Sequence, residues 1–131
     1  MFIVLDTNVL VSALWSEGSK PSAIVSATVT NHFKICYDYR ILEEYRSVLS
    51  RPKFNFDKWQ VDWLLEQLTL SGISVIAKPL PDVRFTDESD RKFYEVAKFC
   101  NATLITGNIR HYPEDKCIST VADFYSSHLA T

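Results

Sequence analysis

The sequence predicts an α/β protein with three layers, α/β/α, around a central parallel sheet of four to five strands. Apolar runs of about four residues alternate with longer segments whose apolar residues recur at helical spacing, which favours a parallel sheet. The runs lack alternating polar residues, as is typical of strands buried on both faces. With 131 residues and 47% hydrophobic content, residues 1–131 are expected to form one domain with a substantial core.

The first strand is expected at Phe2–Leu5, four apolar residues followed directly by Asp6, where a helix begins. Ser19-Lys20-Pro21 opens a further helix that runs to about His32, because proline is tolerated in the first turn. Lys34–Tyr37 is expected to be the second strand.

Asp38 is expected to cap a helix that ends before Pro52. Residues 57–71 form the next predicted helix, which Gly72 closes. Residues 73–77 follow as a strand.

The proline-containing segment 78–85 is expected to be a loop. A helix should run from Asp87 to about Asn101, before a short buried strand at Thr103–Thr106. Residues 117–119 are a candidate edge strand, and residues 121–127 a last helix.

The overall composition narrows the function classes. A net charge of −2 argues against a generally basic nucleic-acid binder, although local basic groups remain compatible with one. The three cysteines show no CxxC and no metal-ligand spacing, so we expect reduced core thiols. The N-terminal apolar run is too short for a signal peptide or a membrane span, and we expect a soluble, cytoplasmic protein without membrane contact.

Polar residues follow the predicted strands at the edge where parallel strands end. Right-handed crossovers bring the carboxyl ends of such strands together, so these side chains should converge. Several carboxylates in one small site require raised pKa values or a shared cation, and Mg²⁺ or Mn²⁺ suits oxygen ligands. Zinc is less suited, since no Cys or His pair has ligand spacing. The residues are Asp6, Asp38, Glu43, Glu44, Asp87, Glu88, Asp90 and Asn108.

Helical geometry selects among neighbouring acids. At about 100° per residue, Glu44 lies beside the apolar stripe of its helix while Glu43 points away. The same count places Asp90 nearer the buried face than Asp87. Structural alternatives stay open here: Asp6 or Asp87 can be a helix N-cap, and Glu44 a surface helix acid.

In these motifs the chain resembles PIN-domain nucleases, over nearly its whole length and in the right order. It looks closest to prokaryotic PIN proteins that act as toxins of toxin–antitoxin systems, related to the VapC group. The resemblance is carried by Asp6-Thr7-Asn8, the segment from Glu44 to Leu49, the segment from Asp90 to Ala97, and the segment from Leu104 to Asn108.

The resemblance implies a Mg²⁺- or Mn²⁺-dependent endoribonuclease, often dimeric and often held inactive by an antitoxin. Asp6, Glu44 and Asp90 would be catalytic acids that bind the metal. Asn108 would be a fourth catalytic residue and stands where many relatives have an acid. Its amide oxygen can still ligate a metal or hold a metal-bound water, but it adds no charge, which puts a two-metal mechanism in doubt. Residues expected to orient the acids are Thr7, Asn8, Asp87 and Thr106.

The mechanism we expect is metal-assisted phosphodiester hydrolysis, in which Asp90 orients or deprotonates the attacking water. Single-stranded RNA is a more plausible substrate than a duplex, because tyrosines such as Tyr112 lie near the same edge and could stack on bases, although core packing is the alternative for each. Residues expected near the substrate are Arg40, Lys92, Arg110 and His111.

Three rival functions were weighed. An aspartyl-phosphate phosphatase lacks its second acid, since Asn8 stands there, and a response-regulator receiver lacks an acceptor aspartate after its third strand. The third is a PIN fold with a degraded site that only binds RNA or protein, which Asn108 favours.

The helix from Asp57 carries more apolar surface than one stripe needs, which suggests contact with a second copy or an antitoxin.

Overall fold

The computed structural model describes residues 1–130 and has a five-stranded parallel sheet in the order β3-β2-β1-β4-β5. It confirms the predicted three-layer α/β/α class. The strands are β1 (Phe2–Leu5), β2 (Lys34–Tyr37), β3 (Ile73–Ser74), β4 (Thr103–Thr106) and β5 (Ile118–Thr120).

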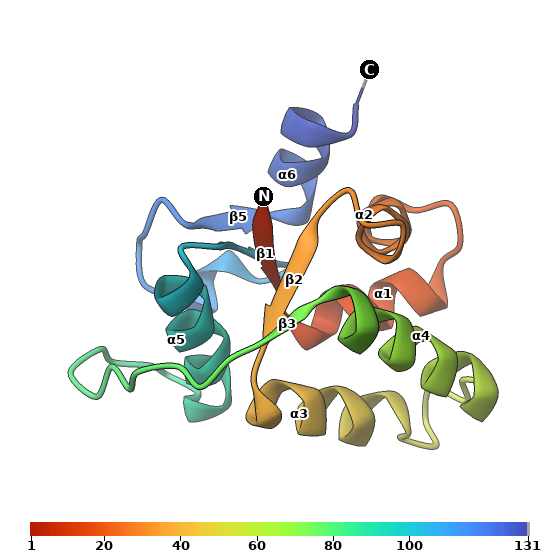
Figure 1. The fold of residues 1–131 in the computed structure, drawn as a ribbon, viewed down its shortest axis with the longest axis horizontal. Coiled ribbons are helices and arrows are strands. Elements are labelled where there is room, and N and C mark those ends of the chain that lie inside the picture. Colours follow the sequence, from red (N-terminus) through yellow and green to blue (C-terminus); the bar gives the residue numbers. More distant parts are fainter. Residues whose placement is uncertain (131) are drawn as a thin grey trace.

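Helices cover both faces of this sheet. Figure 1 shows α5 on one side, α1, α2 and α4 on the other, and α3 beyond the carboxyl ends of β1 and β2. Helix α6 packs against α2, β4 and β5. The helices are α1 (Thr7–Trp15), α2 (Lys20–Val29), α3 (Tyr39–Leu49), α4 (Lys58–Ser71), α5 (Arg91–Cys100) and α6 (Val121–His128), with 3₁₀ turns η1 (Glu88–Asp90) and η2 (Ile109–His111).

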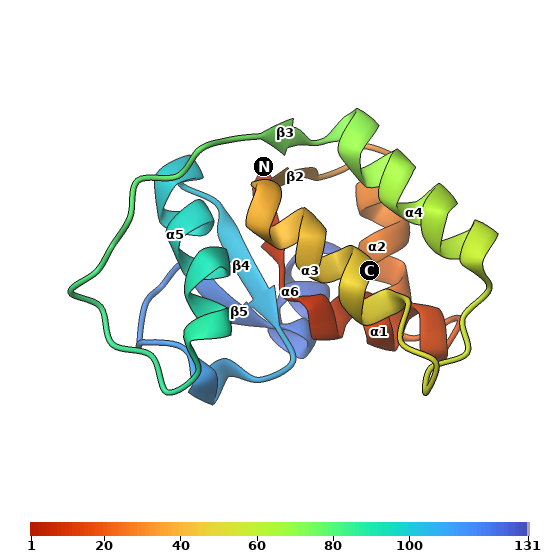
Figure 2. The same cartoon turned by 90° about the horizontal axis from the view of Figure 1, so that it is seen from below.

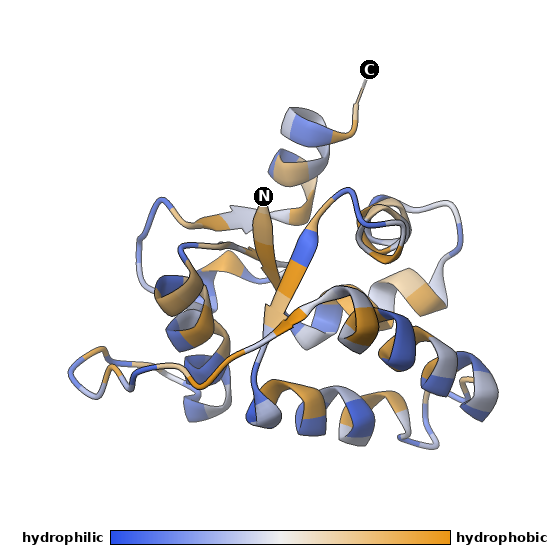
Figure 3. Cartoon of the chain, viewed as in Figure 1, coloured by the Kyte–Doolittle hydropathy of each residue, from blue (hydrophilic) through white to orange (hydrophobic). Residues whose placement is uncertain are grey.

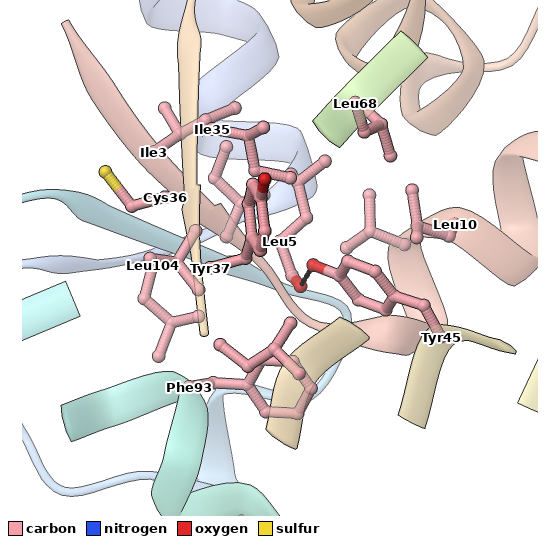
Figure 4. Packing of buried hydrophobic residues seen from close by; sticks show 14 of the residues in the cluster. Ile3, Leu5, Leu10, Ile35, Cys36, Tyr37, Tyr45, Leu68, Phe93 and Leu104 are labelled. Atoms are coloured by element: carbon pink, nitrogen blue, oxygen red, sulfur yellow. Dashed lines mark hydrogen bonds between the residues drawn. The ribbon is translucent and has the colours of Figure 1, made fainter. Parts of the chain in front are cut away.

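The core is centred on β1, whose residues Ile3, Val4 and Leu5 are fully buried. Both faces of this strand are covered, which explains the uninterrupted apolar run. Figure 3 shows β1 and most of β2 as hydrophobic, whereas the helices alternate between hydrophobic and hydrophilic residues. Tyr45 donates a hydrogen bond to the carbonyl of Leu5 and stacks on Phe93, so α3 and α5 are tied to the end of β1 (Figure 4).

Several boundaries differ from the predicted ones. Helix α2 ends at Val29 rather than near His32, because Asn31 takes a left-handed conformation with φ 68°. The strand predicted at 73–77 pairs only at Ile73–Ser74, and the chain then leaves the edge of the sheet. The helix predicted from Asp87 starts as the η1 turn before α5.

Gly72 follows α4 as predicted, but its role is close packing and not a left-handed cap. Its φ is −92°, which any residue can adopt. A Cβ placed there would lie 2.6 Å from Ile35 Cγ2 and 2.6 Å from the carbonyl oxygen of Leu68. Glycine therefore lets the end of α4 lie directly against β2.

Two further expectations concern the whole chain. Within residues 1–130, all three cysteines are free, with Cys36 buried and the other two half-buried. In the same residues, every helix is too short or too polar to cross a bilayer.

Candidate active site

Four elements bring three predicted acids and Asn108 to the carboxyl edge of the sheet. Asp6 directly follows β1, Glu44 lies on the second turn of α3, Asp90 ends η1 and Asn108 follows β4. Figure 2 shows α3 lying across the strand ends, with the start of α5 beside it. Burial raises the pKa of Asp6, and the charge of Glu44 raises it further.

Asp6 does not act as a helix cap. It precedes α1, but its side chain makes no capping hydrogen bond. Its Oδ2 atom instead accepts hydrogen bonds from Thr106 Oγ1 at 2.9 Å and from the Tyr112 hydroxyl at 2.8 Å. Asp6 therefore occupies the N-cap position of α1 without a side-chain cap, and Thr106 and Tyr112 hold one of its carboxylate oxygens.

Glu44 is the acid of its pair that faces the site. Its side chain is 23% exposed, accepts a hydrogen bond from the Thr7 hydroxyl, and lies 2.7 Å from Lys92 Nζ. Glu43 is 51% exposed and lies 3.7 Å from Arg46 Nη1. The helical count that separated these two residues is confirmed.

Asp90 carries an unpaired buried oxygen. The residue is 8% exposed, and its Oδ2 atom has no hydrogen-bond partner. His111 Nδ1 approaches that oxygen to 3.4 Å. Burial raises the pKa of Asp90 to about 6, and the charges of Asp6 and Glu44 contribute to the rise. Such a group stays buried at neutral pH only with a cation nearby or at a cost in stability.

Asp87 is exposed and caps the η1 turn by accepting a hydrogen bond from the Ser89 amide at 2.9 Å. The N-cap alternative for this residue is therefore confirmed. Its charge reaches Asp90 and raises the pKa of that acid, but no direct hydrogen bond joins the two side chains among the described residues.

Two side chains, Asn8 at the start of α1 and Thr106 at the end of β4, accept hydrogen bonds from the backbone of the turn that follows β4. The amide of Gly107 donates to Asn8 Oδ1 at 3.1 Å, and the amide of Asn108 donates to Thr106 Oγ1 at 3.0 Å. The Asn108 side-chain amide lies 2.9 Å from His111 Nε2. Asn8 therefore shapes this turn, and Asn108 holds the imidazole that approaches Asp90.

Two of the basic residues predicted to contact substrate, Arg40 and Lys92, form ion pairs with acids of the protein. Asp38 caps α3 by accepting from the Ile41 amide at 3.0 Å. Arg40 lies 2.7 Å from Asp38 and 2.7 Å from Glu95, so its charge is balanced within the protein. Lys92 likewise pairs with Glu44, whereas Arg110 and His111 are exposed, with His111 close to Asp90.

Sequence reasoning missed the role of Tyr112. Its ring is buried and its hydroxyl holds Asp6, so the expectation that it stacks on a base is wrong. Glu95 was also missed: it is buried and accepts from the Leu80 amide at 2.7 Å. The only sequence signal for Glu95 is its position as an acid on the buried face of an amphipathic helix. No local sequence pattern predicts that η2 brings Tyr112 back against the end of β1.

The donor set suits a hard divalent cation, although it is not assembled as a coordination site. Within residues 1–130, no three His, Cys, Asp or Glu side chains are grouped as metal ligands. The acids nevertheless share one electrostatic environment, and Asp90 Oδ2 is buried without a partner. Carboxylate oxygens are the ligands that Mg²⁺ and Mn²⁺ prefer, so the residues fit such an ion provided that Glu44 turns away from Lys92.

Comparison with known proteins agrees with this architecture. The family model of the PIN domain matches residues 2–110, which include all four positions of the site. An uncharacterized protein from Methanocaldococcus jannaschii is 32% identical over 108 residues, which cover 81% of this chain and 70% of that protein. No solved structure matched the chain.

Proposed function

The chain belongs to the PIN-domain family, and from that membership we propose that it is a Mg²⁺- or Mn²⁺-dependent endoribonuclease that hydrolyses RNA phosphodiester bonds. PIN domains are generally nucleases, which gives the reaction class. The observation that carries the proposal is the buried, unpaired oxygen of Asp90 within the field of Asp6 and Glu44. A cation is the partner that such a group of acids lacks.

The three acids would have different roles in the proposed site. Asp6, Glu44 and Asp90 would hold the cation, which would supply Lewis-acid activation of a phosphate group and of water when bound. Thr106 and Tyr112 fix one oxygen of Asp6 and leave its other oxygen for a ligand. Asp90 would also orient the attacking water, because one of its oxygens has no hydrogen-bond partner in the protein.

The surroundings favour an unpaired RNA strand as substrate. His111 is exposed and approaches Asp90, and Arg110 is the exposed residue before it, so both could contact phosphates. Tyr39 is exposed at the start of α3 and lines a pocket of about 680 Å³ together with Arg40 and Pro79. An exposed aromatic ring on α3, the helix that also carries Glu44, suits stacking with an unpaired base.

A toxin of a toxin–antitoxin pair, related to the VapC group, is the biological role we propose. Such a protein needs a partner surface, and α4 offers Trp59 and Trp63 with 72% and 50% exposure. An antitoxin helix or a second copy of the chain would cover these rings. We further propose that the protein acts in the cytoplasm, where RNA substrates and an antitoxin partner would be available.

The second candidate function is a PIN fold that binds RNA or protein without cleaving it. Two observations favour it: Asn108 is neutral, and the described residues contain no preassembled group of three metal ligands. The surviving Asp6, Glu44 and Asp90 oppose it.

An RNA cleavage assay separates the two functions. A mixture of single-stranded and structured RNAs is incubated with the protein in Mn²⁺, and again in EDTA. We expect cleavage in Mn²⁺ that EDTA abolishes, and a loss of at least about 100-fold in Asp90→Asn and Glu44→Gln. Glu43→Gln is the matched control, since Glu43 is exposed on the same helix turn and should retain full activity. Cleavage that survives EDTA and Asp90→Asn would overturn the proposed chemistry.

A further inference from the structure

Lys92 is a lysine placed directly against a proposed metal-binding acid, Glu44. Its Nζ atom lies 2.7 Å from Glu44 Oε1, and the two side chains are only 13% and 23% exposed. The ammonium group also donates to the Ser89 carbonyl and lies 5.1 Å from the centre of the Phe93 ring. Lys92 is therefore held on three sides and is not a mobile surface lysine.

Both oxygens of Glu44 are thereby occupied. Lys92 takes Oε1 and the Thr7 hydroxyl takes Oε2. Asp90, by contrast, keeps a buried oxygen without any hydrogen bond. The protein thus provides a lysine for Glu44 and leaves Asp90 Oδ2 without a hydrogen bond. This distribution agrees with the finding that, within residues 1–130, the acids are not grouped as ligands of a common ion.

We propose that Lys92 is a positioning residue that neutralises Glu44 in the metal-free protein and must release Glu44 before a divalent cation binds. This inference rests on the proposed function. A carboxylate oxygen that keeps an ammonium group at 2.7 Å cannot also approach a metal closely, because the two positive charges repel strongly in a partly buried site. Lys92 therefore weakens metal binding, and removing its charge strengthens it.

The Ser89 carbonyl is a hydrogen-bond acceptor for the ammonium group after its displacement from Glu44. Ser89 lies in η1, next to Asp90, and already accepts a hydrogen bond from Lys92. A small rotation about the end of the lysine side chain would break the contact with Glu44 and keep the one with Ser89. The freed positive charge would then lie beside the site, where a phosphate of the substrate would sit.

Calorimetric titration with MnCl₂ tests this inference without measuring activity. The variants are Lys92→Met, which removes the charge, Lys92→Arg, which keeps it, and Lys98→Met. Lys98 is the matched control, because it lies on the same helix and pairs with Asp115 at 2.9 Å away from the acids. We expect Lys92→Met to bind Mn²⁺ about tenfold more tightly than the wild type. Lys92→Arg should bind no more tightly than the wild type, and Lys98→Met should bind equally well.

A second measurement uses the wild-type protein. Lysine labelling with an amine-reactive reagent, read by mass spectrometry, should accelerate at Lys92 in Mg²⁺ and stay constant at Lys98. Equal Mn²⁺ affinity of Lys92→Met and wild type, or unchanged labelling of Lys92, would overturn the inference.

The outcomes also separate this inference from the proposed function. Mn²⁺ binding that requires Asp6 but is insensitive to Lys92→Met would leave the metal site standing and remove only the role of Lys92. Absence of Mn²⁺ binding in the wild type and in Lys92→Met alike would contradict both. Mn²⁺ binding seen only in Lys92→Met would support the inference, and it would show that Lys92 prevents the wild-type protein from binding the metal.

Discussion

Asp90 carries a stability cost that can be measured apart from any activity. Burial raises the pKa of Asp90 to about 6 from an ordinary value of 3.8, so the folded protein binds its proton more tightly than the unfolded chain does. As the pH rises through this window, the unfolded state is the first to release the proton. The free energy of unfolding contributed by Asp90 therefore falls between about pH 4 and pH 6.

Replacing Asp90 with Asn should stabilise the metal-free protein at pH 7.5. We expect a gain of about 1–3 kcal/mol in the free energy of unfolding, measured by urea denaturation in EDTA, because a buried uncompensated charge is removed. The gain should shrink toward zero near pH 4, where the acid is protonated. Glu43→Gln should change little at either pH. A variant that is less stable than the wild type at pH 7.5 would show that Asp90 is compensated in solution.

At the residue scale, the acids and the threonines that contact them, Thr7 and Thr106, were predictable, whereas the contacts of Tyr112 and Lys92 were not. Helical spacing alone distinguished Glu44 from Glu43, because a single helix fixes which side faces the core. The contacts of Tyr112 and Lys92 depend on how η2 and α5 pack on β1 and α3, which local spacing does not encode. The hydrogen bond from Tyr112 to Asp6 spans 106 residues of sequence and follows only from the fold.

At the scale of elements, the junction between α4 and β3 is the most constrained point. Gly72 brings the end of α4 so close to β2 that an added methyl group would overlap both Ile35 and the backbone of Leu68. We expect Gly72→Ala to lower the free energy of unfolding by about 1–3 kcal/mol, since overpacking forces neighbouring atoms to shift. Denaturant curves would measure this loss, and superimposable curves would show that the junction can relax.

Elements were predicted where the local pattern is unambiguous. The strands β1, β2 and β4 match their apolar runs residue for residue, because each is buried on both faces. β3 is shorter than its apolar run, since pairing at an edge requires only one neighbour and the chain departs after Ser74. The start of α5 was misplaced because the cap at Asp87 opens a 3₁₀ turn and not the α-helix itself.

At the scale of the whole molecule, alternating strands and helices were enough to predict the α/β/α class. The topology places every strand end at one edge, which is why residues as distant as Asp6 and Asn108 meet there. The interpretation of residues 1–131 as a single domain stays a prediction.

The exposed face of α4 predicts self-association or partner binding. Two tryptophan rings exposed along one helix are a surface that soluble proteins usually cover. We expect sedimentation velocity to show a dimer or larger species for the wild type, and Trp59→Ser with Trp63→Ser to shift it toward the monomer. Leu70→Ser is the control, because Leu70 is also exposed on α4 but lies at its far end. A monomeric wild type would leave only a different protein as the partner of this face.

The most direct measurement of the central claim is an anomalous-difference map from crystals grown with MnCl₂. The account predicts one manganese peak at the carboxyl edge of the sheet, with oxygens of Asp6, Glu44 and Asp90 within about 2.0–2.6 Å of it. A peak that lacks any of these three carboxylates, or a map with no peak at this edge, would contradict it.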